Sequence, residues 1–230
     1  MIFLFAAALA AAAPGSASCP DVITPDALVC RALSAQKSGN AEAAAQSFEE
    51  AAKTSSDKDP RTARMWAAAG NLWIAAGQPG KAALDLDRAL ALPGMEAEQR
   101  GEALLDRARA AEAQNDLKTA RAKITEAAAS ISDDPFYWYF SAALAIREND
   151  NATAQAAIGK AITLAPSDPA ILFEAGHVAH VLGDDDKARG YWMRAAGSDP
   201  SGPIGKEAAK AAELLGVTPT IKTDTPPPSR

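Results

Sequence analysis

Residues 135–168 read PFYWYFSAALAIRENDNATAQAAIGKAITLAPSD, and residues 169–202 read PAILFEAGHVAHVLGDDDKARGYWMRAAGSDPSG. Each stretch contains an apolar segment long enough for a helix, a short polar segment, and a second helical segment. The polar segments, Asn149-Asp150 and Gly183-Asp184, are residue types that tolerate left-handed backbone and cap a following helix. The two stretches therefore predict two consecutive helix-turn-helix units of equal length.

The same spacing of small residues extends toward the N-terminus. Units of 34 residues fit 25–58, 63–96, 101–134, 135–168 and 169–202, with four extra residues after each of the first two units. The eighth, twentieth and twenty-seventh residues of every unit are alanine or glycine: Ala32, Gly70, Ala108, Ala142, Gly176; Ala44, Ala82, Ala120, Ala154, Ala188; Ala51, Ala89, Ala127, Ala161, Ala195. A fixed period with this agreement indicates a repeat protein.

This pattern resembles the tetratricopeptide repeat family, in which small residues at these offsets bring two antiparallel helices close together. The resemblance covers residues 25–202 and implies an all-α fold, a right-handed superhelix (α-solenoid) of five helix-turn-helix repeats. An amphipathic segment over 203–216 predicts a C-terminal capping helix that ends at Gly216. The family also implies a non-catalytic scaffold or adaptor that binds proteins or peptides and needs no cofactor.

The composition excludes several other classes of protein. The chain has 230 residues, of which 48% are hydrophobic and 23% charged, and its formal net charge is −6. Such an acidic chain has no basic stripe to neutralise phosphates, so nucleic acid is not an expected partner. The sequence also contains no Gly-x-x-x-x-Gly-Lys-Ser/Thr, Gly-x-Ser-x-Gly, His-Glu-x-x-His or Cys-x-x-Cys motif, and we therefore expect no enzyme.

The two ends of the chain have patterns of their own. Residues 2–13 form an uncharged apolar run that small residues follow, which is typical of a signal peptide, here over 1–18. We therefore expect an exported protein of the bacterial periplasm or cell envelope, with a short leader at 19–24 before the first repeat. Residues 217–230 hold four prolines and few apolar residues, which predicts a disordered Pro/Thr tail.

Cys19 and Cys30 are the only cysteines, and the sequence leaves three roles open for them. In an oxidising compartment, a disulfide between them would pin the leader to the first helix and contribute about 3 kcal/mol in the chain-entropy model. Alternatively, Ala17-Ser18-Cys19 ends like the recognition sequence of a lipid-modified cysteine, and only then do we expect membrane contact. The third possibility is a pair of idle thiols.

In the family that the pattern resembles, the first helix of each repeat lines a concave groove. The groove offsets carry over to Val29, Leu33, Arg64, Asn71, Ile74, Leu105, Arg109, Glu112, Phe136, Tyr139, Phe140, Ile146, Phe173, His177 and His180. Aromatic side chains supply large desolvated contact areas, so the last two repeats are the predicted hot spot for an apolar extended peptide or amphipathic helix. The alternative is that some of these aromatic residues pack one repeat against the next.

Other binding roles fit the residues less well. A clamp for a terminal carboxylate is disfavoured because Ala67 and Asp106 stand where such clamps have a lysine and a neutral amide. His177 and His180 share one helical face, which Glu174 could join as a metal ligand, but two histidines do not close a zinc site. Two rivals within the binding class are a homo-oligomer that forms through the alanine-rich end or groove, and a lipid-anchored structural subunit of an envelope complex.

Overall fold

The computed structural model describes residues 19–216, which form eleven helices and no strand in that range. The predicted signal peptide (1–18) and Pro/Thr tail (217–230) lie outside the described residues. In chain order the helices are α1 (Pro25–Lys37), α2 (Ala41–Thr54), α3 (Pro60–Ala75), α4 (Pro79–Ala91), α5 (Ala97–Ala113), α6 (Leu117–Ile131), α7 (Pro135–Arg147), α8 (Asn151–Leu164), α9 (Pro169–Val181), α10 (Asp185–Ser198) and α11 (Pro203–Gly216). None of the described helices is long and apolar enough to cross a bilayer.

The repeated small residues lie where the two helices of a pair meet. All thirteen alanines at the three repeated offsets are 0% exposed, and the two glycines at these offsets are buried as well. A Cβ atom added to Gly176 of α9 would lie 2.2 Å from Nε1 of Trp192 in α10. Since even one extra carbon does not fit there, the small residues are what allow the paired helices to approach so closely.

Each of the five helix pairs turns through a residue with left-handed backbone. Gly39, Gly77 and Gly183 have φ angles of 76°, 69° and 80°, and Asn115 and Asn149 take the same place with φ angles of 61° and 60°. Glycine adopts this region at no steric cost, and asparagine tolerates it. In four pairs the next residue then caps the second helix by accepting a backbone N–H bond three residues on: Asn40, Asp116, Asp150 and Asp184.

The extra residues after the first two units become the first turns of helices. The repeat spacing starts the second and third units at residues 63 and 101, whereas α3 begins at Pro60 and α5 at Ala97. These two helices therefore have 16 and 17 residues, while α1, α7 and α9 have 13 each. The insertions lengthen the inner helices and leave the connecting loops short.

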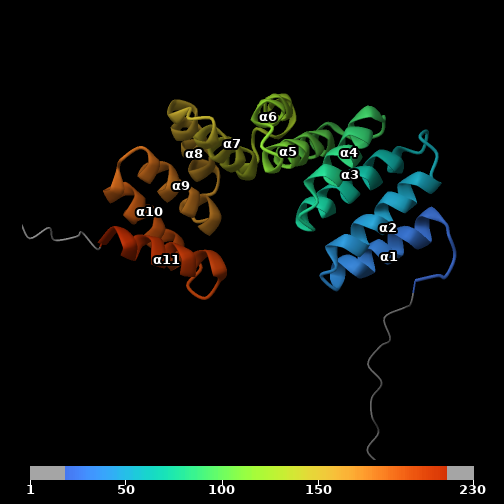
Figure 1. The fold of residues 1–230 in the computed structure, drawn as a ribbon, viewed down its shortest axis with the longest axis horizontal. Coiled ribbons are helices and arrows are strands. Elements are labelled where there is room, and N and C mark those ends of the chain that lie inside the picture. Colours follow the sequence, from blue (N-terminus) through green and yellow to red (C-terminus); the bar gives the residue numbers. More distant parts are fainter. Residues whose placement is uncertain (1–18, 217–230) are drawn as a thin grey trace, which may run out of the picture.

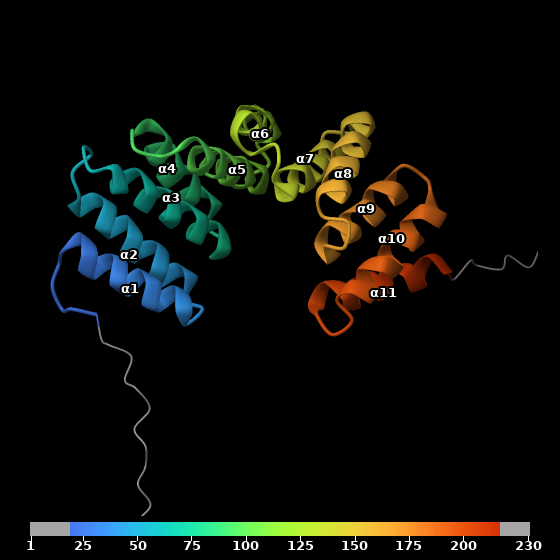
Figure 2. The ribbon, with the colours of Figure 1, turned by 180° about the vertical axis from the view of Figure 1, so that it is seen from behind.

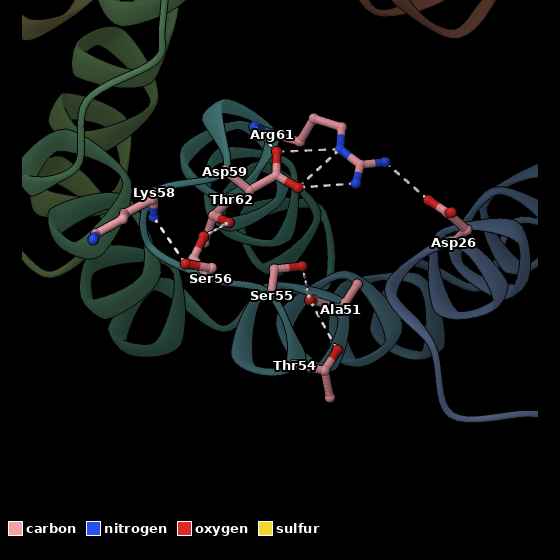
Figure 3. A network of polar contacts seen from close by, with 9 residues as sticks. All are labelled: Asp26, Ala51, Thr54, Ser55, Ser56, Lys58, Asp59, Arg61 and Thr62. Atoms are coloured by element: carbon pink, nitrogen blue, oxygen red, sulfur yellow. Dashed lines mark hydrogen bonds and ion pairs between the residues drawn. The ribbon is translucent and has the colours of Figure 1, made fainter.

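The start of α3 is tied to the first helix pair by a polar network (Figure 3). Asp59 accepts a hydrogen bond from the backbone N–H of Arg61 at 2.9 Å, and the Arg61 guanidinium pairs with both Asp59 and Asp26 of α1. The Thr62 hydroxyl donates to the Ser56 carbonyl at 2.7 Å. These contacts satisfy the free N–H groups of the helix end and fix its direction.

The helix pairs follow one another along an arch (Figure 1), which Figure 2 shows from behind. In both views α5 and α7 lie on the inner side of its bend and α6 on the outer side. The first helices α3, α5, α7 and α9 contact one another in succession and form the inner layer. At the C-terminal end, α11 packs on α9 and α10 with Ala208 and Ala212 buried. The predicted all-α solenoid with a capping helix is confirmed.

Candidate binding cleft on the inner face

A cleft of about 480 Å³ opens between α3, α5 and the start of α7. Its lining combines apolar walls with charged and amide groups: Arg64, Ala67, Ala68, Asn71, Met95, Gln99, Glu102, Ala103, Leu105, Asp106, Arg109, Asp134 and Phe136. A concave site with an apolar floor and a few fixed polar groups is the usual form of a binding site. We refer to this site below as the inner cleft.

Phe136 is the large apolar side chain that the inner cleft leaves accessible, with 39% of its surface exposed. It stands at the N-terminus of α7, where Asp134 caps the helix by accepting the Phe136 N–H at 2.8 Å. The Arg109 guanidinium of α5 lies over the Phe136 ring, 5.5 Å from its centroid. This cation–π contact orients the ring across the gap between α5 and α7.

The polar groups of the inner cleft are held by one another across two helices. Arg109 pairs with Asp106 one helical turn away at 2.8 Å, and Asp106 accepts a hydrogen bond from the Asn71 amide of α3 at 2.7 Å. A partner would therefore meet side chains that are already ordered, which lowers the entropic cost of binding.

The carboxylate of Glu102 lies in a negative environment. Partial burial and the neighbouring charges of Glu98, Asp106 and Asp134 raise the pKa of Glu102. Among residues 19–216 no ion pair includes Glu102, so its charge is not neutralised by a neighbour there. Its position favours the approach of a positive group.

Aromatic and charged side chains continue from the inner cleft toward α9. The Phe136 and Tyr139 rings stack with their centroids 5.3 Å apart, and burial together with the negative charge of Glu174 raises the pKa of Tyr139. Glu174 is only 8% exposed, and its Oε1 has no hydrogen-bond partner among the described residues. Its Oε2 lies 3.7 Å from Nδ1 of His177, whose pKa this carboxylate raises. We call Phe136, Tyr139, Glu174 and His177 the inner strip.

The structure divides the residues that the repeat offsets placed in a groove. Asn71, Leu105, Arg109 and Phe136 line the inner cleft together with Arg64, and Tyr139 and His177 belong to the inner strip. Two predicted groove residues outside these sites are exposed, Leu33 and His180. Three others are partly buried against the core, Val29, Ile74 and Ile146. Glu112 pairs with Arg147.

One of the predicted groove aromatics packs inside the protein and a second is partly buried. Phe140 is 7% exposed and contacts the core between α5, α6 and α7, so it does not line the groove. Phe173 is partly buried against α10, with its ring centroid 6.4 Å from that of Trp192. Phe140 thus packs its repeat against the preceding one, which is the alternative that the sequence left open for some aromatics.

Eight residues that line the inner cleft were not among the predicted groove residues: Ala67, Ala68, Met95, Gln99, Glu102, Ala103, Asp106 and Asp134. Glu102 and Asp134 are charged residues, and the sequence prediction selected mainly aromatic and apolar ones. Glu102 occupies the second position of its unit, so the offset rule itself was sufficient to find it. Met95 lies in the loop before α5 and Gln99 in the first turn of α5; Gln99 belongs to the four inserted residues, for which the repeat provides no equivalent position.

His177 and His180 each lie beside a carboxylate. Nδ1 of His180 is 2.7 Å from Oδ1 of Asp185, and His177 is next to Glu174 as described above. Within residues 19–216, no three His, Cys, Asp or Glu side chains come together in a way that could hold a metal ion. The local geometry is that of histidine–carboxylate pairs on the surface of α9.

Cys19 and Cys30 are joined by a disulfide, with their Cα atoms 5.7 Å apart. The bond ties the segment before α1 to the middle of that helix. Because the Cys19 sulfur takes part in this disulfide, it is not a free thiol to which a lipid could be attached through a thioether.

Comparisons with known proteins place the fold. Residues 31–96 and 141–203 match a family model described as the tetratricopeptide repeat, while no curated protein matches the chain. Among solved structures, PilW, described as a widely conserved type IV pilus biogenesis factor, has a TM-score of 0.67 with 18% identity over 80% of this chain and 82% of its own. PilF of Pseudomonas aeruginosa has a TM-score of 0.64 with 17% identity over 83% of both chains.

A third similar structure is that of YrrB, described as a TPR protein with an unusual peptide-binding site. Its TM-score is 0.57 with 17% identity, over 80% of this chain and 91% of its own. At such low identities these neighbours show only that the fold is shared. The segments that match the family model, however, cover more than half of the chain. This chain therefore belongs to the tetratricopeptide repeat family.

Proposed function

We propose that this protein is a non-catalytic scaffold that binds a segment of another protein on the inner face of its arch. The observation that carries the proposal is the inner cleft, in which Phe136 remains 39% exposed among ordered polar groups from α3 and α5. Covering an aromatic ring in a concave site removes a large apolar area from water at a small entropic cost.

The partner that we propose is an extended apolar peptide or an amphipathic helix. The walls supply apolar contacts through Ala67, Met95 and Leu105, while Asn71 and Arg109 can set the orientation of a backbone or side chain. The description of YrrB as a protein with a peptide-binding site supports a peptide as the bound group.

We also propose that the protein is exported and works in the bacterial cell envelope. The apolar N-terminal run supports export, and so does the Cys19–Cys30 disulfide, because such bonds persist in oxidising compartments. The description of PilW as a type IV pilus biogenesis factor is a further argument for a location in the cell envelope. The disulfide favours this function over a lipid-anchored subunit. The mass of the protein recovered from the cell envelope tests export and lipid attachment. The change of that mass on reduction tests the disulfide.

A peptide selection tests the binding function directly. Peptides would be selected from a random displayed library on the wild-type protein, and the affinity of each selected peptide would then be measured for two variants. We expect Phe136→Ala to weaken binding by at least about tenfold, the usual effect of removing a central aromatic contact.

The matched control is Leu84→Ala, which removes a large side chain that is 61% exposed on α4, outside the inner cleft. Circular dichroism would establish that both variants are folded. Equal affinity of the selected peptides for the wild type and Phe136→Ala would move the binding site away from the inner cleft. A mass that rises with protein concentration would instead favour the homo-oligomer.

A further inference from the structure

The inner cleft carries more negative than positive charge. Three carboxylates line it, those of Glu102, Asp106 and Asp134, against the two guanidinium groups of Arg64 and Arg109. Arg109 is already paired with Asp106 at 2.8 Å, and Glu102, Asp134 and Arg64 are in no ion pair among residues 19–216, so one negative charge remains in excess. A partner that complements this cleft should therefore carry positive charge here.

Glu174 supplies a second, independent observation on the same face. It lies on α9, which packs against α7, and its negative charge contributes to the raised pKa of Tyr139. Burial of a carboxylate oxygen without a hydrogen-bond donor is costly, and Oε1 of Glu174 has none within the described part of the chain. A donor from a bound partner, reached by a rotation of the Glu174 side chain, would relieve this cost.

Phe136 lines the inner cleft with Glu102, and its stacking partner Tyr139 is the ring whose pKa the charge of Glu174 raises. Aromatic faces attract cations, and Arg109 already approaches the Phe136 ring in this way. A long basic side chain is suited to the position, because its apolar stem can cover the rings while its charged end reaches a carboxylate. A neutral or acidic side chain would leave Glu102 without a counter-charge and would bring no charged donor to Oε1 of Glu174.

We propose that the segment bound on the inner face carries a lysine or arginine side chain, which lies along Phe136 and Tyr139 with its cation between Glu102 and Glu174. This inference rests on the proposed binding function and adds the chemistry of the partner to it. The expected partner is a basic amphipathic segment of another protein, and acidic segments are rejected by the same carboxylates.

Two labelled synthetic peptides with blocked ends test the inference, ALKALKALA and its acidic counterpart ALEALEALA. Their affinities for the full chain would be measured by fluorescence anisotropy at low salt. We expect the lysine peptide to bind at least about tenfold more tightly than the glutamate peptide, and this preference to shrink as added salt screens the charges. Equal affinities, tighter binding of the acidic peptide, or binding of neither peptide would overturn the inference.

Variants of the chain identify the residues responsible. Glu174→Gln and Glu102→Gln keep the size of each side chain and should each weaken the lysine peptide several-fold, while Glu207→Gln, at an exposed position on α11, should change nothing. Glu102 is exposed, so its variant remains informative even where the buried Glu174 variant does not fold. Unchanged affinity in Glu102→Gln would overturn the assigned position of the cation.

The two proposals fail in different ways. If Phe136→Ala weakens both peptides alike and the carboxylate variants weaken neither, the inner cleft binds peptides but does not select a basic side chain. If the library selection yields peptides that ignore Phe136, the binding function itself is misplaced.

Discussion

The close contact at Gly176 predicts opposite effects for one substitution at two helix positions. Gly176 of α9 and Gly159 of α8 both lie inside helices, so replacing either with alanine stabilises the helix by about 0.5–1 kcal/mol through propensity alone. At Gly159 no atom lies within 4 Å of the new Cβ, so Gly159→Ala should raise the free energy of unfolding by that amount.

At Gly176 the new Cβ lies 2.2 Å from Nε1, 2.4 Å from Cδ1 and 2.7 Å from Cε2 of Trp192. The indole is rigid and 7% exposed, and its N–H donates to the Phe173 carbonyl at 3.0 Å, so it cannot move aside freely. Overpacking of this kind costs about 1–3 kcal/mol. A displaced indole also loses a hydrogen bond worth about 1 kcal/mol.

We therefore expect Gly176→Ala to lower the free energy of unfolding by about 1–3 kcal/mol after the helix gain is subtracted. Urea denaturation followed by far-ultraviolet circular dichroism compares the two variants with the wild type, and tryptophan fluorescence reports on Trp192. Because a repeat array can unfold in more than one step, both probes are needed. A Gly176→Ala variant as stable as the wild type would show that the pair α9–α10 is not packed on this glycine.

Three further predictions concern named side chains. Phe173→Ala should destabilise the fold by about 1–3 kcal/mol, while the exposed Phe136→Ala should change stability by less than about 1 kcal/mol, as measured by urea denaturation. Burial and the charge of Glu49 raise the pKa of Asp85 from 3.8 to about 6. Between these two pH values, the folded state keeps a proton on Asp85 that the unfolded state has released. Stability should therefore fall as the pH rises through that window, by up to about 3 kcal/mol, and Asp85→Asn should remove the slope in urea denaturation at several pH values. Glu174→Gln should lower the pKa of His177 toward its ordinary value in an NMR titration, and an unchanged pKa would contradict the pairing.

The fold could be predicted because residues at fixed positions of the repeat are restricted to very few residue types. An alanine such as Ala142 recurs at a fixed offset because two helices meet there, and Gly183 is needed because its φ of 80° excludes most side chains. Both requirements are local, so they are visible in the sequence. The starts of α3 and α5 were placed too late, because Pro60 and Ala97 belong to insertions in which the repeat has no register.

The site was only partly predictable because the face of a helix that enters the core depends on how that helix is rotated against its neighbours. Tyr139 and Phe140 are both aromatic and adjacent, yet only Phe140 enters the core with Leu104 and Leu144. The offset rule assigns both to the groove, since it assumes the same helix rotation in every repeat. Packing between α6 and α7 sets the actual rotation, and a single sequence does not reveal it.

Part of the inner cleft lies outside the segments that match the family model. The family model matches residues 31–96 and 141–203, whereas Glu102, Asp106, Arg109 and Phe136 all lie between these segments. The four residues inserted before the third unit extend α5 by its first turn, and Gln99 of that turn lines the cleft beside Phe136 of α7. A local irregularity thus supplies side chains for recognition while the regular repeats on both sides hold the arch together.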